Sequence, residues 1–216
     1  MRNGRLRGLT LFHTADSNVG VFEEAARAIG LDIAMNHVVR ADLLTRAQDA
    51  GELTAEIAAD ARAAMAALVG SQTQLLCTCS TIGPAADDLV GEGLSVQRVD
   101  RALAEASFAA GGDAAVIVAV PTTLPPTREV FDEAARRAGG TFSLHLVDNA
   151  WPHFCDGNLS QYYRVLADAI LPLQARYPVI ALAQASMAPV ALRPGWTSRV
   201  LSSPAVSLGT MAIARR

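Results

Sequence analysis

The order of secondary-structure signals in this sequence restarts about halfway along the chain. A strand signal at residues 8–14 leads into a polar loop, and an apolar, β-branched run at residues 114–120 leads into another. The two loops begin 107 residues apart, at positions 14 and 121, and Cys79 and Ser186 are also 107 residues apart. This order and spacing predict two half-chain repeats with corresponding turns.

Within each repeat, strand signals alternate with helix signals, which favours parallel sheets covered by helices on both faces. We therefore predict an α/β fold with two pseudo-symmetric flavodoxin-like lobes. The first lobe is predicted at residues 1–99 with 205–216, and the second at residues 100–204. Because ligands in such folds bind beyond the carboxyl ends of the strands, we expect a cleft between the lobes.

The predicted elements are short and regularly spaced. Strands are predicted at residues 8–14, 31–39, 73–79, 94–99, 114–120, 141–148, 179–183 and 200–202. Helices are predicted at residues 22–29, 54–69, after Pro84, 104–110, up to 138, 159–176 and from about 204. Thr54 and Asp100 are expected to cap helices, and Gly139 to end one. Residues 40–51 are expected to connect elements with some helical pattern, and residues 149–157 to form a loop.

The composition limits the classes of partner. The chain has a net charge of −3, which gives no electrostatic case for binding nucleic acid or an acidic membrane. No apolar run approaches the roughly 18 residues of a membrane span. Three cysteines, an odd number, fit a reducing compartment, so we expect a cytoplasmic protein. Its Ala-rich helices are compatible with a homodimer.

The turn after the third predicted strand places the Cys79 thiol beside the hydroxyl groups of Ser80 and Thr81. Free backbone N–H groups and the helix dipole at such a turn favour a thiolate, which is reactive. The alternative, a small buried packing residue, is equally compatible with the sequence, and it is the better interpretation of Cys77. The cysteines and histidines lack the spacing of a metal site, so we expect no metal.

Polar residues follow two other predicted strands. Asp16 and Ser17 could bind substrate or orient the thiol, or could only cap the following helix. Thr122 and Thr123, with Thr127 further along, lie in the matching loop of the second half. With the N–H groups of a helix start they could bind a carboxylate without any arginine, although loop threonines are often only solvated or capping.

The remaining polar and aromatic candidates carry weaker signals. Residues 151–155 could form a lid or an ordinary packed loop. A structural or surface role is expected for the four histidines, which show no partner spacing: His13, His37, His145 and His153.

Several of these segments share their order and spacing with the motifs of a known superfamily. Residues 16–20, Asp-Ser-Asn-Val-Gly, are similar to an Asp-Ser-Gly-Val-Gly motif, and residues 79–81, Cys-Ser-Thr, to a Cys-Asn-Thr turn. Thr123 falls where a carboxylate-binding threonine is found, and residues 183–189 where a Gly-Cys-Thr turn is expected. Over nearly its full length the chain thus resembles the aspartate/glutamate/hydantoin racemase superfamily.

The resemblance implies an active site between two lobes, without metal or pyridoxal cofactor. In the amino-acid racemases of this superfamily, two cysteines face opposite sides of the substrate α-carbon; one removes a proton and the other donates one. This chain departs from that pattern, because Ser186 stands at the second cysteine position and Met187 replaces the histidine that usually follows. A serine hydroxyl is far less acidic than a thiol, and it needs a strong base to ionise usefully.

We therefore predict a cofactor-independent isomerase or racemase acting at the α-carbon of a small amino or dicarboxylic acid. Cys79 is predicted to be the acid/base or nucleophile, and Ser186 the group on the opposite face. The predicted substrate-binding residues are Asp16, Ser17, Ser80, Thr81, Thr122 and Thr123. A one-thiol decarboxylase of the same superfamily and a non-catalytic protein that binds small carboxylates are the alternatives.

Overall fold

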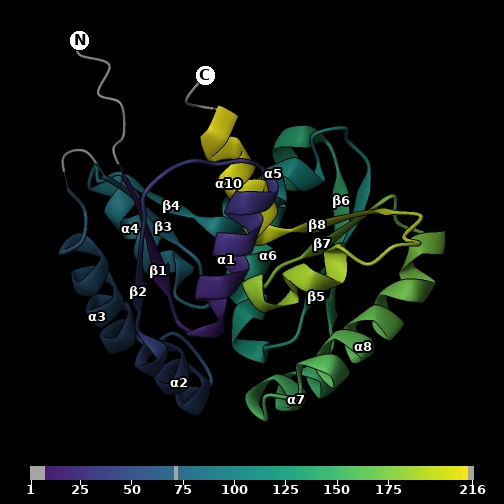
Figure 1. The fold of residues 1–216 in the computed structure, drawn as a ribbon, viewed down its shortest axis with the longest axis horizontal. Coiled ribbons are helices and arrows are strands. Elements are labelled where there is room, and N and C mark those ends of the chain that lie inside the picture. The colour runs from purple at the N-terminus through teal and green to yellow at the C-terminus, as the bar shows by residue number, and fades with distance from the viewer. Residues whose placement is uncertain (1–7, 71–72, 214–216) are drawn as a thin grey trace.

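Two parallel sheets of four strands each form the framework of the molecule (Figure 1). The computed structural model describes residues 8–70 and 73–213. In the first sheet the strand order is β2-β1-β3-β4, with bounds Met35–Val39, Gly8–His13, Thr73–Cys77 and Val96–Arg98. In the second sheet the order is β6-β5-β7-β8, with bounds Thr141–Leu146, Asp113–Val118, Val179–Leu182 and Arg199–Ser202.

The two sheets have the same topology, because the first strand of each half pairs in parallel with both the second and the third. The prediction of an α/β fold with two flavodoxin-like lobes is therefore confirmed. The division of the chain into residues 1–99 with 205–216 and residues 100–204 stays a prediction. Figure 1 shows the first half on the left, the second half on the right and α10 between them.

Helices connect the strands and cover the sheets. In the first half they are α1 to α5, with bounds Ser17–Ala28, Ala41–Ala50, Ala55–Ala66, Gly83–Gly91 and Val99–Ser107. The later α-helices are α6 to α10, with bounds Leu124–Ala138, Trp151–Cys155, Leu159–Ile170, Ala188–Ala191 and Ser203–Ile213. Short 3₁₀ helices, η1 to η4, span Pro121–Thr123, Asp148–Ala150, Leu171–Ala175 and Ala185–Met187.

Each sheet is buried between two apolar clusters, as expected for parallel strands. Side chains of α2, α3 and α4 pack on one face of the first sheet, and those of α1 and α10 on the other. On the second sheet, α5 and α6 cover one face, while α8 and α9 cover the other. The alternation of side chains along β5 sends Val116 to one cluster and Ile117 to the other, which explains why this strand is apolar throughout.

Local chemistry at several helix ends agrees with the sequence. The Thr54 hydroxyl accepts a hydrogen bond from the Ile57 N–H at 3.3 Å, which confirms its predicted capping role. Gly139 ends α6 in the left-handed conformation, with φ of 68°, as a C-terminal glycine should. At the start of α1, however, the Asp16 side chain makes no capping bond.

Two local predictions were wrong. Asp100 does not cap a helix at residues 104–110; α5 begins earlier, with Arg98 at its N-cap, and Asp100 lies in its first turn. The segment at residues 149–157 contains η2 and α7 rather than forming a simple loop. Residues 40–51, which were expected to connect elements with some helical pattern, do contain a helix, α2. In each case tertiary contacts extend helical structure into segments whose local sequence signals are mixed.

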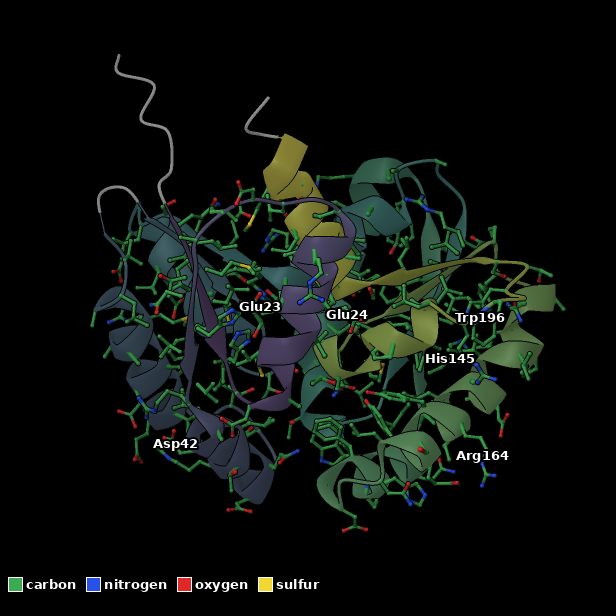
Figure 2. The ribbon with its side chains drawn as sticks, viewed as in Figure 1. Glu23, Glu24, Asp42, His145, Arg164 and Trp196 are labelled. Atoms are coloured by element: carbon green, nitrogen blue, oxygen red, sulfur yellow. The ribbon has the colours of Figure 1, made fainter. Side chains whose placement is uncertain are left out.

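The carboxylate of Asp100 instead forms a buried ion pair with Arg98. Arg98 Nε donates to Asp100 Oδ1 at 2.9 Å, and a terminal guanidinium nitrogen donates to Oδ2 at 2.7 Å. Arg98 is 3% exposed and Asp100 is 1% exposed. An exposed pair repeats this arrangement at the start of α2, where Arg40 binds Asp42 with two bonds of 2.7 Å (Figure 2).

These two pairs give a matched test of burial. Asp100→Ala should lower the free energy of unfolding by about 3 kcal/mol, because it leaves the buried Arg98 charge without its buried, bidentate partner. Asp42→Ala removes the same bidentate geometry at the surface and should cost less than about 1 kcal/mol. Urea denaturation followed by circular dichroism measures both, and equal losses would contradict the buried pair as the stronger contributor.

Candidate active site

A cavity opens between the two halves at the carboxyl ends of β1, β3, β5 and β7. Turns after all four strands contribute to its wall, together with α2 and α7. Its lining residues are Thr14, Ala15, Asn18, Leu44, Thr78, Cys79, Ser80, Thr81, Val120, Thr123, Trp151, Phe154, Gln184, Ala185 and Ser186. The location agrees with the rule that doubly wound sheets bind ligands beyond the carboxyl ends of their strands.

Cys79 lies in the turn between β3 and α4, and its free thiol is partly exposed in the cavity. Cys77, two residues earlier, is buried in the apolar cluster beneath the first sheet. Burial raises the pKa of the Cys77 thiol to about 12, and its sulfur lies 3.6 Å from the Cys79 carbonyl oxygen, to which it donates. Cys77 therefore packs as a core residue, as the sequence favours, and Cys79 is the thiol that meets the cavity.

Ser186 lies in η4, the turn after β7, at the position that corresponds to Cys79. It is 7% exposed, and its hydroxyl oxygen lies 2.8 Å from the hydroxyl oxygen of Tyr162. Tyr162 comes from α8 and is fully buried, and this burial raises the pKa of its phenol well above the ordinary value. The partner of Ser186 is thus a neutral hydroxyl, which can donate a hydrogen bond but is no strong base.

The predicted hydroxyl residues divide between the cavity wall and its support. Ser80, Thr81 and Thr123 line the cavity. The Ser80 hydroxyl also donates to the Ala183 carbonyl oxygen at 3.3 Å, which ties the first half to the second. Thr122 lies outside the lining, but its hydroxyl is 3.4 Å from that of Thr81, a second contact between the halves.

Asp16 and Ser17 are exposed at the start of α1. They line a shallower hollow outside the cavity, which shares Leu44, Trp151 and Phe154 with it. The structure therefore places these two residues near the entrance rather than beside Cys79. Their roles in binding substrate stay a prediction.

Several lining residues were missed by the sequence analysis. Asn18 is 6% exposed, and its Oδ1 has no hydrogen-bond partner. Gln184 accepts the backbone N–H of Ala119 through Oε1, which leaves its amide NH₂ as a donor. Trp151 and Phe154 of α7 stack with ring centroids 4.7 Å apart, so the segment considered as a lid does border the cavity. The sequence pointed only to their segments: the resemblance covered residues 16–20 and 183–189, which contain Asn18 and Gln184, and residues 151–155 were a possible lid.

The cavity wall carries no ionised cation or carboxylate among the described residues. Its polar groups are the Cys79 thiol, hydroxyls, the amides of Asn18 and Gln184, and backbone groups. A bound carboxylate would therefore be held by neutral donors. No three His, Cys, Asp or Glu side chains within residues 8–70 and 73–213 are arranged to hold a metal ion.

The histidines are arranged in a way that their spacing did not reveal. His13, at the end of β1, bonds to His37 of β2, and the two rings lie nearly parallel, with an interplanar angle of 12° and centroids 5.2 Å apart. His13 also bonds to Thr78, the residue before Cys79. His145 and His153 line neither the cavity nor the hollow beside it.

No protein-family model matches the sequence, and no curated protein matches it significantly. Solved structures do match. An aspartate racemase from Picrophilus torridus superposes with a TM-score of 0.73 at 9% identity, covering 95% of this chain and 94% of that one. A glutamate racemase from Bacillus anthracis gives 0.69 at 12% identity, over 96% and 81% of the two chains. An aspartate racemase homologue from Pyrococcus horikoshii gives 0.65 at 11% identity, over 97% and 99%.

This chain has the fold of the aspartate and glutamate racemases. The likeness extends over nearly the whole chain, so both lobes belong to the shared fold. At these identities it shows the architecture, and the reaction has to be argued from the site itself. No helix among the described residues is long and apolar enough to cross a membrane.

The contrast between Cys77 and Cys79 can be tested with iodoacetamide. At pH 8 we expect Cys77 to react at least about 100-fold more slowly than Cys79, because a buried thiol with a raised pKa contains little thiolate. Tandem mass spectrometry locates the modified residue, and the exposed Cys155 serves as an internal control. All three thiols should react alike in urea; equal rates in the native protein would contradict the described burial of Cys77.

Proposed function

We propose that the chain is a cofactor-independent enzyme of the isomerase/racemase type, which moves a proton at the α-carbon of a small amino or dicarboxylic acid. The observation that carries this is the placement of Cys79 and Ser186. They come from corresponding turns of the two lobes and line one cavity. A substrate held between them would present opposite faces of its α-carbon to a thiol and to a hydroxyl.

The neutral donors of the cavity support the chemistry. Removal of an α-proton leaves an enediolate, whose negative charge spreads onto the carboxylate oxygens. The Thr81 hydroxyl and the amide NH₂ of Gln184 border the same space, and the Ser80 and Thr123 hydroxyls would join them by turning their protons away from the Ala183 and Val120 carbonyl oxygens. Such preorganised donors stabilise developing oxyanion charge more than they stabilise the ground state. Asp16, Ser17 and Thr122 are proposed to act further out, at the entrance and in support of Thr81.

The two faces of the site differ in acid strength. Cys79 can alternate between thiolate and thiol, taking the α-proton and returning it. Ser186 can pass a proton to the opposite face only by becoming an alkoxide that the Tyr162 hydroxyl stabilises with one hydrogen bond. Because the phenol is buried, it does not readily give up its own proton. The Cys79 face should therefore dominate proton transfer.

A deuterium-exchange assay tests the role of Cys79. Incubation in deuterated water with aspartate, glutamate and 2-substituted dicarboxylates should place deuterium at the α-carbon of a substrate, as read by NMR. Cys79→Ser should lower this rate at least about 100-fold, the usual contribution of one positioned acid/base group. Cys155→Ser, which removes an exposed thiol outside the cavity, should leave the rate unchanged. Exchange that survives Cys79→Ser would rule out this thiol as the base.

The difference in acid strength between Cys79 and Ser186 predicts different rates for exchange and for inversion. Exchange of the α-proton with retention of configuration should be at least about tenfold faster than inversion, because Ser186 is a much weaker acid than a thiol. Chiral chromatography of the deuterated product measures both rates. Replacing the serine by a thiol, Ser186→Cys, should bring inversion closer to exchange. Equal exchange and inversion rates in the unmodified chain would show that Ser186 and Tyr162 form an efficient second acid.

The same asymmetry favours a one-thiol decarboxylase as the second candidate. When a malonate-type acid loses CO₂, its C–C bond breaks and the electron pair forms the enediolate. Cys79 then donates its thiol proton to the α-carbon, and the thiolate regains a proton from solvent. This route needs a proton from one face only. Release of CO₂ from a 2-substituted malonate, with one enantiomer as product, would favour it; tight binding of dicarboxylates without exchange or turnover would favour a binding protein.

A further inference from the structure

Behind the Cys79 turn, four polar side chains form one continuous line of hydrogen bonds. Glu23 Oε1 lies 3.0 Å from His37 Nε2, and His37 Nδ1 lies 2.9 Å from His13 Nε2. His13 Nδ1 lies 2.8 Å from the Thr78 hydroxyl oxygen, which is itself 3.0 Å from the Phe12 carbonyl oxygen. The line runs from a half-exposed carboxylate on α1 to the residue next to Cys79.

When all of these bonds form at once, the two ends of the line set the direction of each one. The Phe12 carbonyl can only accept, so the Thr78 hydroxyl donates its single proton there and must accept from His13 Nδ1–H. His13 Nε2 is then an acceptor, and His37 Nδ1–H donates to it. The Glu23 carboxylate also accepts, so His37 Nε2 carries a proton as well.

We infer that His37 is held as an imidazolium, paired with Glu23, and that through neutral His13 and Thr78 it positions the turn that carries Cys79. All the bonds can form at once only when the two rings share three N–H protons. With one proton fewer, one bond in the line is lost. His13, His37 and Glu23 are thus positioning residues, since His13 acts on Cys79 only through Thr78. Their effect on catalysis rests on the proposed function, whereas the protonation state does not.

The burial of the two rings agrees with this assignment. His13 is fully buried, and burial together with the nearby charge of His37 lowers the pKa of His13 to about 4. His13 is therefore neutral at pH 7, and the extra proton belongs to His37, which lies next to a carboxylate. The Phe22 ring packs against His13 with centroids 5.4 Å apart and offers no competing acceptor.

The other charged groups near this strand end are already engaged. Arg40 donates its backbone N–H to the His13 carbonyl oxygen at 2.9 Å, while its guanidinium binds Asp42. Glu24 follows Glu23 along α1 but is exposed, and no described bond joins it to either ring (Figure 2). Glu23 is thus the carboxylate that can stabilise the imidazolium, and Glu24 is a matched control one residue away.

The mechanical consequence follows from the two bonds that Thr78 makes to Phe12. Its backbone N–H and its hydroxyl both donate to the Phe12 carbonyl oxygen, each at 3.0 Å. His13 completes the set by donating to the same hydroxyl. The chain immediately before Cys79 is therefore fixed to the end of β1. The turn after β1 lines the same cavity through Thr14, Ala15 and Asn18. Loss of the His37 proton would loosen this attachment.

The protonation state can be read directly by NMR of the imidazole nitrogens in the intact chain labelled with ¹⁵N-histidine. At pH 7 we expect two ring N–H groups on His37 and one, at Nδ1, on His13. Glu23→Gln keeps an oxygen acceptor but removes the charge, and it should lower the pH at which the pair loses its shared proton by about one unit. Glu24→Gln should leave that pH unchanged. A His37 ring with a single N–H at pH 7 would overturn the assignment.

The positioning role is read from the rate at which iodoacetamide modifies Cys79 between pH 5 and 9. Besides the rise that any thiol shows as it ionises, we expect a separate step in this profile at the pH where NMR sees the histidine pair titrate, and this step should move with Glu23→Gln. Thr78→Val, which removes the hydroxyl and keeps the shape, should abolish the step and lower the neutral-pH rate about tenfold. Cys155 in the same sample should show none of these changes. A Cys79 profile that neither variant changes would overturn the positioning role. The NMR and the iodoacetamide measurements need no substrate, so they test this inference even when no acid shows deuterium exchange and the proposed function fails.

Discussion

The position of the Cys79 turn depends on one buried cation, Arg98. Its guanidinium is bound by Asp100 and Asp87, and it lies so close to Gly83 that a Cβ there would be 2.5 Å from its Nε. Gly83 begins α4, the helix that follows the turn. Arg98 also reaches the Pro126 carbonyl oxygen, at 3.5 Å, in the first turns of α6. One charge therefore fixes a helix start in each lobe, and with them the two walls of the cavity.

Burying the Arg98 charge removes it from water, which opposes folding. Its contribution here is to fix the positions of neighbouring groups more than to stabilise the fold. Replacing buried ion pairs by apolar residues often stabilises a protein, so the pair is weak evidence for stability by itself. Apolar packing, however, tolerates small shifts, whereas a bidentate bond fixes both distance and direction. A site that transfers a proton between a thiol and a carbon needs its groups held within a fraction of an ångström. The absence of a side chain at Gly83 is the local condition that lets the guanidinium approach.

The architecture could be predicted from the sequence because strand and helix signals alternate along the chain and restart halfway. The run at β5 and the corresponding turns at Cys79 and Ser186 indicated two equivalent lobes, and the structure has them. The contacts that distinguish the two turns could not be predicted, because they join residues far apart in sequence. Tyr162 reaches Ser186 from a helix whose local pattern indicates only an amphipathic face. His13 and His37 meet because β1 and β2 pair in register, with His37 opposite Leu11 and two residues from the partner of His13.

The residues that line the cavity are neutral, and the charged residues lie behind them. Its wall is neutral, so a bound acid meets hydroxyls, amides and backbone N–H groups rather than an arginine or lysine. A cation in the wall would already bind the substrate carboxylate in the ground state, and the part of its attraction that the substrate and the enediolate share does not speed the chemical step. The charged groups lie behind the wall instead: Arg98 with its carboxylates on one side, and His37 with Glu23 on the other.

Placed there, these charges act on the protein rather than on the ligand. Arg98 fixes where α4 and α6 begin, and the histidine pair fixes Thr78 against β1. Both sets converge on the few residues around Cys79, whereas the partner that the described residues give the Ser186 hydroxyl is a neutral phenol. The first lobe therefore carries the electrostatic machinery and the second supplies a hydrogen-bonded hydroxyl. That inequality, more than the identity of Ser186 alone, is why proton transfer is expected to run mainly through the thiol.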